Sequence, residues 1–162
     1  MNLVKKSHLA LVVTALIGLT GTSRADTWDY KHFAGGQCQT FFGARAQNYT
    51  TNYFYNYSTG VESVTCPVVR DTSYAANIDA GVTVRSNGGL LQCNFQSYNA
   101  SGNLVASVAR YTYSTVATNL YFWLNSSQVA FDGTFIISCY LPPNSYVMKY
   151  ISGEGIDTDD YN

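Results

Sequence analysis

Hydrophobic and polar residues alternate along most of the chain with a period of two residues. In the segment 90–98, Leu91, Cys93 and Phe95 fall on one side. The segment 134–141 alternates in the same way, with Ile137 on its apolar side. This period predicts β-strands that have one buried face. No apolar stripe with the period of a helix persists for three turns, so the pattern predicts an all-β protein.

Turn-forming residues divide the alternating segments into eight or nine predicted strands. Asn87-Gly88-Gly89 and Pro142-Pro143-Asn144 are two of these turn sequences. The strands are expected at 37–42, 49–57, 61–69, 81–86, 90–98, 104–113, 119–124, 134–141 and 146–151. Many short strands at regular spacing predict a disulfide-stapled antiparallel β-sandwich, either a jelly roll or an immunoglobulin-like fold.

The first 25 residues have the organisation of a secretory signal peptide. Lys5 and Lys6 precede an apolar run over 9–19, and Ser23-Arg24-Ala25 supplies the small residues of a cleavage site. This pattern is typical of bacteria. The apolar run is shorter than the roughly 18 residues of a membrane-spanning helix. We therefore expect a secreted or periplasmic protein with no membrane span after cleavage.

The mature chain is predicted to be a single β-sandwich domain over 26–152, followed by an acidic, flexible tail over 153–162. The tail carries Glu154, Asp157, Asp159 and Asp160 with almost no apolar residue. The carboxylates of Asp157, Asp159 and Asp160 could supply calcium ligands, but the spacing lacks the glycine and terminal glutamate of a calcium-binding loop. No metal site and no cofactor is predicted.

The composition argues against a nucleic-acid-binding protein. The chain of 162 residues has a formal charge of −1, and the charge becomes three units more negative without Lys5, Lys6 and Arg24. The remaining basic residues are scattered singly, whereas a surface that follows phosphates needs clusters of them. The chain also contains 14 Tyr, 8 Phe and 2 Trp, which all follow residue 25.

Four cysteines follow the predicted cleavage site, and an even number in an exported protein predicts disulfide bonds. No close pair of the C-x-x-C type suggests a metal site. Three pairings are possible. We favour Cys38–Cys66 with Cys93–Cys139, because each of these bonds would join strands that the pattern makes neighbours.

Catalytic residues are not evident, and we expect a protein that is not an enzyme. His32 is the single histidine after the signal peptide, and no G-x-S-x-G motif accompanies it. A glycoside hydrolase needs two carboxylates across a cleft. The candidates are Glu62, Asp71, Asp79, Asp132 and Glu154. Asp71 beside Arg70 and Asp132 beside Gly133 are also explained by an ion pair and a turn.

A tyrosine-rich segment over 48–57 is the most informative feature for function. If it is extended, Tyr49, Tyr53, Tyr55 and Tyr57 share one face. Such a strip could stack against sugar rings or a peptide. Tyrosine also favours strands and packs well against other aromatic residues, so structural packing is the alternative and the simpler explanation.

A second aromatic site lies at 119–124, where alternation places Tyr121 and Trp123 opposite an apolar face. Both side chains are either exposed or covered by a loop, and the sequence favours neither. Together with the tyrosine strip they are the candidate ligand-binding residues.

The segment Val64-Thr65-Cys66-Pro67-Val68-Val69-Arg70-Asp71 matches the pattern V-x-C-P-[IV]-x-R-D. With Leu91-Gln92-Cys93, the turn 98–103 and Cys139 before Pro142, the chain resembles a group of small, uncharacterised secreted bacterial proteins with four cysteines. The resemblance covers most of 37–145 and implies export and a disulfide-bonded β fold. It implies no activity.

Taken together, these features predict an exported, non-catalytic binding or surface module that contacts glycans or a cell-surface protein through tyrosines. One alternative is a structural or adhesive subunit that assembles through strand edges. A less favoured one is a small glycan hydrolase that uses carboxylates.

Overall fold

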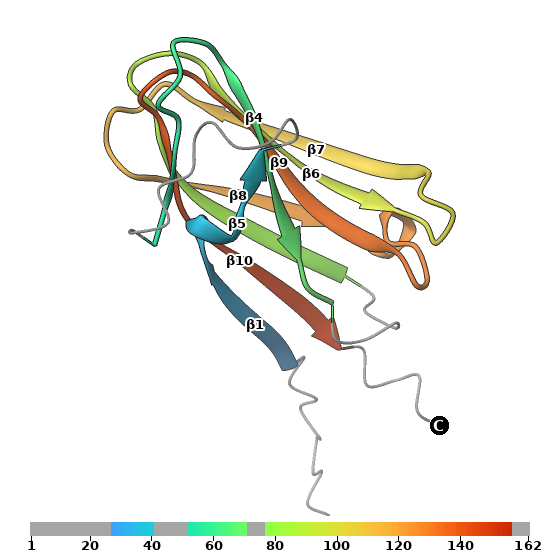
Figure 1. The fold of residues 1–162 in the computed structure, drawn as a ribbon. Helices are drawn as coiled ribbons and strands as arrows, with labels where there is room; N and C mark the ends of the chain where they lie inside the picture. Colours follow the sequence, from blue (N-terminus) through green and yellow to red (C-terminus); the bar gives the residue numbers. More distant parts are fainter. Residues whose placement is uncertain (1–26, 41–51, 71–76, 157–162) are drawn as a thin grey trace, which may run out of the picture.

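The computed structural model describes residues 27–40, 52–70 and 77–156, which form two antiparallel sheets packed face to face (Figure 1). Sheet A has the order β1 (Thr27–Ala34), β10 (Tyr146–Ile156), β5 (Asn77–Arg85) and β8 (Thr118–Leu124), and β3 (Phe54–Tyr55) pairs with the start of β10. Sheet B has the order β2 (Gln39–Thr40), β4 (Glu62–Val68), β9 (Thr134–Leu141), β6 (Leu91–Tyr98) and β7 (Leu104–Thr112). Two short 3₁₀ helices, η1 (Gly35–Gln37) and η2 (Ser126–Gln128), connect strands.

The connections identify the sandwich as a jelly roll. From β4 to β10 the chain passes from one sheet to the other at every step except β6 to β7. Immunoglobulin domains instead keep several consecutive strands paired within one sheet. The predicted β-sandwich is therefore confirmed, and of the two predicted topologies the structure has the jelly roll.

The inner faces of the two sheets form one hydrophobic core, as the alternation predicts. Leu91, Cys93 and Phe95 of β6 are buried, and so are Ile137 of β9 and Phe122 of β8. The ring of Phe95 lies 6.0 Å from that of Phe122, between centroids, which joins the two sheets through aromatic contact. The outward positions of the same strands are free to carry polar or functional side chains.

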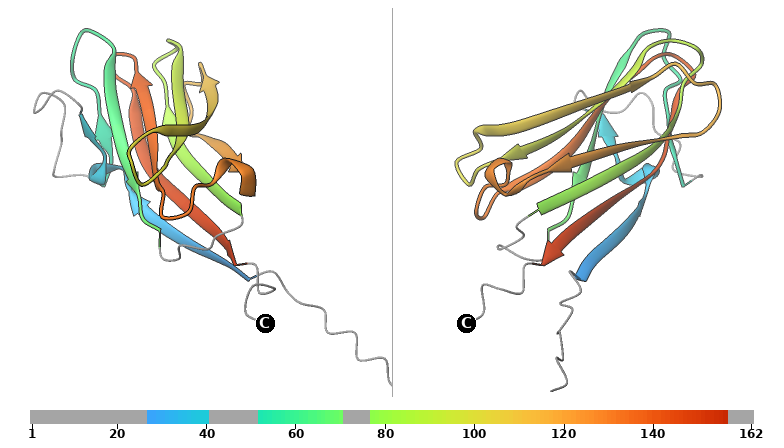
Figure 2. Two further views of the ribbon diagram at one scale, coloured as in Figure 1. Left: turned by 90° about the vertical axis from the view of Figure 1, so that its right-hand side faces the viewer. Right: turned by 180° about the vertical axis from the view of Figure 1, so that it is seen from behind.

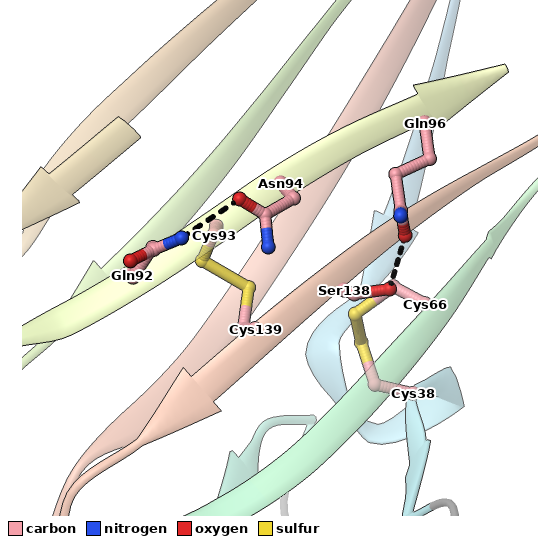
Figure 3. The surroundings of a disulfide bond; sticks show 8 residues. All are labelled: Cys38, Cys66, Gln92, Cys93, Asn94, Gln96, Ser138 and Cys139. Atoms are coloured by element: carbon pink, nitrogen blue, oxygen red, sulfur yellow. Dashed lines mark hydrogen bonds between the residues drawn. A yellow bond between two sulfur atoms is a disulfide. The ribbon is translucent and has the colours of Figure 1, made fainter. Parts of the chain in front are cut away.

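Both predicted disulfides are present (Figure 3). Cys93 and Cys139 face each other directly across the neighbouring strands β6 and β9. Cys38, just before β2, bonds to Cys66 of β4. On the other face of β6, Gln92 donates to Asn94 at 3.0 Å, so these outward amide groups bind each other.

The predicted boundary between the domain and the tail is wrong. Strand β10 runs to Ile156, and Glu154 has an exposed fraction of only 2%. Gly153 and Gly155 interrupt the hydrophobic pattern, but they lie inside the sheet because β1 and β5 flank β10 on both sides (Figure 2). Burial lowers the pKa of Arg70, and the negative charge of Glu154 offsets part of this decrease. Residues 157–162 lie outside the described residues.

Three other expectations need correction. The pattern did not predict β1, which forms an edge of sheet A. Within the described residues, the expected strands at 37–42 and 49–57 are represented by β2 and β3 alone, and residues 41–51 lie outside the described part. Very short strands have little local signal, because their pairing partners come from distant segments.

No helix in the described residues is long and apolar enough to cross a membrane.

Candidate functional site

The outer face of sheet A collects aromatic side chains from both of its edges. The register places Tyr30 of β1 opposite Gly153, Gly153 opposite Asp79, and Asp79 opposite Trp123. Alternation therefore points these positions away from the core, since Ile78 and Phe122 point into it. We call Trp28, Tyr30 and Trp123 the tryptophan cluster.

The rings of the tryptophan cluster contact one another and remain accessible. The centroid of Trp28 lies 6.0 Å from that of Tyr30 and 5.6 Å from that of Trp123. The exposed fraction is 50% for Trp123 and 49% for Tyr30. Trp28 is half-buried between them. Such a cluster, with both indoles of the chain, is unusual for packing alone, because Trp123 and Tyr30 leave apolar area in water.

Glycine residues of β10 make room for these rings. A methyl group on Gly153 would collide with Asp79 and would lie 2.6 Å from Cε1 of Tyr30. The indole of Trp28 lies over Gly155, whose added methyl group would meet it at 3.4 Å. The absence of side chains on β10 thus lets rings from the two edge strands lean over the middle of the sheet.

Asp79 supplies a carboxylate beside the rings. The hydroxyl of Tyr30 donates to its Oδ2 at 3.3 Å, and its Oδ1 is buried without a hydrogen-bond partner in the described residues. Burial raises the pKa of Asp79, and the hydrogen bond from Tyr30 opposes this effect. Burial, followed by the charge of Asp79, raises the pKa of Tyr30. The pair therefore combines a hydroxyl and a carboxylate at the edge of an apolar surface.

A pocket of about 230 Å³ follows the tryptophan cluster along the strands. His32 and Tyr121 line its two sides, and Gly81 lies between them in the register. Thr83 and Lys149 also line the pocket, and the hydroxyl of Thr83 donates to Asn119 at 2.6 Å. The outer face of sheet A is therefore hollowed at its centre and lined by polar groups.

A second pocket of about 220 Å³ is lined by Tyr53, Arg85, Tyr146 and Met148. Tyr146 contacts Tyr53 at 5.3 Å and Tyr55 at 4.4 Å between ring centroids. The guanidinium of Arg85 lies 5.7 Å from the centre of the Tyr146 ring, and its Nε donates to the carbonyl of Thr115 at 2.9 Å. This end of the face therefore combines aromatic rings with a fixed positive charge.

The structure places the candidate residues in two groups. Tyr121 and Trp123 are exposed on the outer face of sheet A, so the exposed alternative holds for them. Tyr53 and Tyr55 are half-buried against Tyr146, and Tyr57 is exposed beside Tyr55 with centroids 4.1 Å apart. Tyr49 lies outside the described residues.

Sequence reasoning missed Trp28 and Tyr30. Their alternation in Trp28-Asp29-Tyr30 was the available signal, but the segment is short and follows the predicted cleavage site directly. Only the pairing of β1 with β10 brings these rings next to Trp123.

Of the candidate catalytic carboxylates, Asp71 lies outside the described residues, and the described ones do not gather in a cleft on this face. Asp79 points outward from sheet A, whereas Glu154 is buried on the inner side of the same sheet. Asp132 precedes Gly133 in a turn and has a φ of 52°, as expected of a turn-forming residue. His32 is exposed and lines a pocket to which no carboxylate of the described ranges contributes.

No protein-family model and no curated protein matches the chain. Solved structures show the same fold at low identity. The apo form of a carbohydrate-binding module of BiXyn10A has a TM-score of 0.52 and 14% identity over 81% of this chain and 98% of that chain. A carbohydrate-binding domain (CBM36-1) of a multidomain xylanase from the hindgut metagenome of Trinervitermes trinervoides has a TM-score of 0.50 and 10% identity over 80% and 100% of the two chains.

A structure of infectious bursal disease virus, Gt strain, has a TM-score of 0.51 and 14% identity over 90% of this chain and 37% of the viral chain. Jelly rolls occur in both capsid and lectin proteins. The likeness therefore concerns the β-sandwich, which this chain shares with carbohydrate-binding modules.

Proposed function

We propose that the protein is an exported, non-catalytic glycan-binding module that uses the outer face of sheet A. The observation that carries this proposal is the tryptophan cluster, in which the exposed rings of Trp123 and Tyr30 flank the half-buried indole of Trp28 over glycine residues and beside a carboxylate. The two disulfides fit a protein that works in an oxidising compartment.

The chemistry of the cluster suits a sugar. One side of a pyranose ring is covered by C–H groups, which stack on aromatic faces, while its rim carries hydroxyl groups. The carboxylate of Asp79 can accept from such a hydroxyl at Oδ2, the oxygen that Tyr30 also contacts, and a charged acceptor makes a stronger hydrogen bond than a neutral one. Binding sites of this type combine apolar area with a few placed polar groups.

The fold supports the proposal without deciding it. Carbohydrate-binding modules are among the solved structures that share this sandwich. We assign the ligand to this surface because of the tryptophan cluster and not because of the fold.

A glycan array followed by affinity electrophoresis tests the proposal. The intact protein should bind at least one polysaccharide, and Trp123→Ala should weaken this binding about tenfold, which corresponds to the loss of one stacking contact. Tyr113→Ala is the matched control, because Tyr113 is as exposed as Trp123 but lies in the loop after β7. An intact protein that binds no glycan would refute the proposal.

Strand β7 favours a second candidate, assembly through a sheet edge. In the described part of the chain β7 pairs with β6 alone, and Leu104, Val105 and Tyr111 are exposed on it. Its single charge, on Arg110, gives little protection against pairing with another strand. A molar mass from light scattering that rises with concentration would support assembly, and a constant monomer mass would exclude it.

A further inference from the structure

Basic side chains extend from the centre of the outer face of sheet A toward one end. His32 and Lys149 line the central pocket, and Arg85 lines the pocket beyond it. Among the residues that the structure describes, no acidic one takes part in lining these two pockets. Asp79 lies toward the opposite end, beside Trp123. In a chain with a net negative charge, this local excess of positive charge is a feature of the site and not of the composition.

The two pockets are neighbours on one continuous surface. Thr83 lines the central pocket and Arg85 lines the next one, and these outward residues of β5 are about 6.6 Å apart along the strand. From Asn77, in register with Gly155 beneath Trp28, to Arg85 the strand spans about 26 Å. This length exceeds a single sugar ring several times, so the surface suits an extended chain.

Arg85 is held in a fixed position. Its Nε donates to the carbonyl of Thr115, and its guanidinium lies against the ring of Tyr146. A guanidinium that is already ordered loses little entropy when its remaining N–H groups bind a carboxylate. Lys149 is exposed and adds a second positive charge at the adjacent pocket.

We infer that the ligand is an extended polysaccharide that carries carboxylated sugars, such as uronic acids. Its uncharged ring faces stack on the tryptophan cluster, and its carboxylates lie at Lys149 and Arg85, where charge-assisted hydrogen bonds form. This inference rests on the proposed function and adds to it the charge and the length of the ligand.

Polygalacturonate, alginate and glucuronoxylan, each compared with its own carboxyl-reduced form, provide the test. The reduction keeps the backbone and linkage and removes only the charge. Affinity electrophoresis should show at least one acidic form bound about tenfold more tightly than its reduced form, a difference that high salt diminishes. For the same polysaccharide, binding should strengthen with oligosaccharide length beyond the disaccharide.

Arg85→Gln and Lys149→Gln should each reduce the preference for the acidic form while binding to the reduced form stays the same. Arg110→Gln is the control, because Arg110 is exposed on β7 of the other sheet. Since Lys149 is exposed, its variant keeps the test valid if the Arg85 variant unfolds. Equal binding of acidic and reduced forms would overturn the inference and leave the proposed function intact. Failure to bind any glycan would remove both.

Discussion

Trp28 and Trp123 meet across sheet A, with ring centroids 5.6 Å apart and planes inclined at 47°. They belong to β1 and β8, the two edge strands of the four long strands in this sheet. Two strands lie between them, and the rings can meet because β10 presents glycine at this level. The contact creates a single apolar surface from the first and the last quarter of the chain.

The contact between the two indoles predicts how iodide and a bound glycan affect the tryptophan fluorescence of the protein. Trp28 and Trp123 are its only indoles, and iodide should quench both Trp123→Phe and Trp28→Phe variants, since neither ring is buried. A bound glycan should protect each variant from quenching. Protection of Trp123 without protection of Trp28 would show that the two rings do not belong to one site.

Gly153→Ala should destabilise the fold and disturb the site at the same time. Its methyl group would overlap Asp79 and approach the ring of Tyr30, and overpacking of this kind costs about 1–3 kcal/mol. Thermal unfolding should show the loss. Gly60→Ala is the matched control, because no atom lies within 4 Å of its added methyl group. Equal melting temperatures for both variants would contradict the observed packing.

The raised pKa of Asp79 predicts a pH-dependent effect of Asp79→Asn. A carboxyl whose pKa is higher in the folded state than its ordinary value of 3.8 stabilises the fold when protonated. That stabilisation is lost as the pH rises through the folded-state pKa, so ionised Asp79 costs stability at neutral pH. The amide avoids this cost and still accepts from Tyr30.

We therefore expect Asp79→Asn to melt at a higher temperature than the native protein at neutral pH. The two melting temperatures should converge as the pH falls below 3.8. Glycan affinity should fall in the same variant, because an amide oxygen is a weaker acceptor than a carboxylate. If the variant were less stable than the native protein at neutral pH, other groups of the folded protein would have to stabilise the ionised carboxylate.

Removal of the disulfide between β6 and β9, by replacing Cys93 and Cys139 with alanine, should lower the free energy of unfolding by up to about 4.0 kcal/mol. The bond closes a loop of 46 residues, and loop-closure entropy gives this value. For Cys38 and Cys66, separated by 28 residues, the same model gives about 3.6 kcal/mol. Urea denaturation measures both. A loss below about 1 kcal/mol in either case would indicate residual structure in the unfolded chain.

The central strands could be predicted because their signal is local. Leu91, Cys93 and Phe95 alternate with amides, and the structure buries the first set and exposes the second to the outer face. The short extent of β3 within the predicted strand 49–57, and the end of β10, could not be predicted in this way. Phe54–Tyr55 pairs with only two residues of β10, and Gly153 and Gly155 carry no side chains that could show a pattern.

About half of the candidate site could also be predicted from the sequence. Alternation in the segment 119–124 placed Tyr121 and Trp123 opposite the core, although it did not tell whether a loop covers them. Tyr53 and Tyr55 were predicted on one face, but Tyr146, which packs between them and Arg85, comes from a strand with no comparable tyrosine pattern.

The sequence by itself determined the β fold and the outward direction of Trp123, because a period of two residues is a property of neighbouring positions. It favoured one pairing of the cysteines among three, and the structure shows that pairing. Tertiary structure alone decided that Trp28, Tyr30 and Asp79 join Trp123, and that Lys149 and Arg85 continue the same surface. Strand order and register set these contacts, and both depend on pairing between segments that are far apart along the chain.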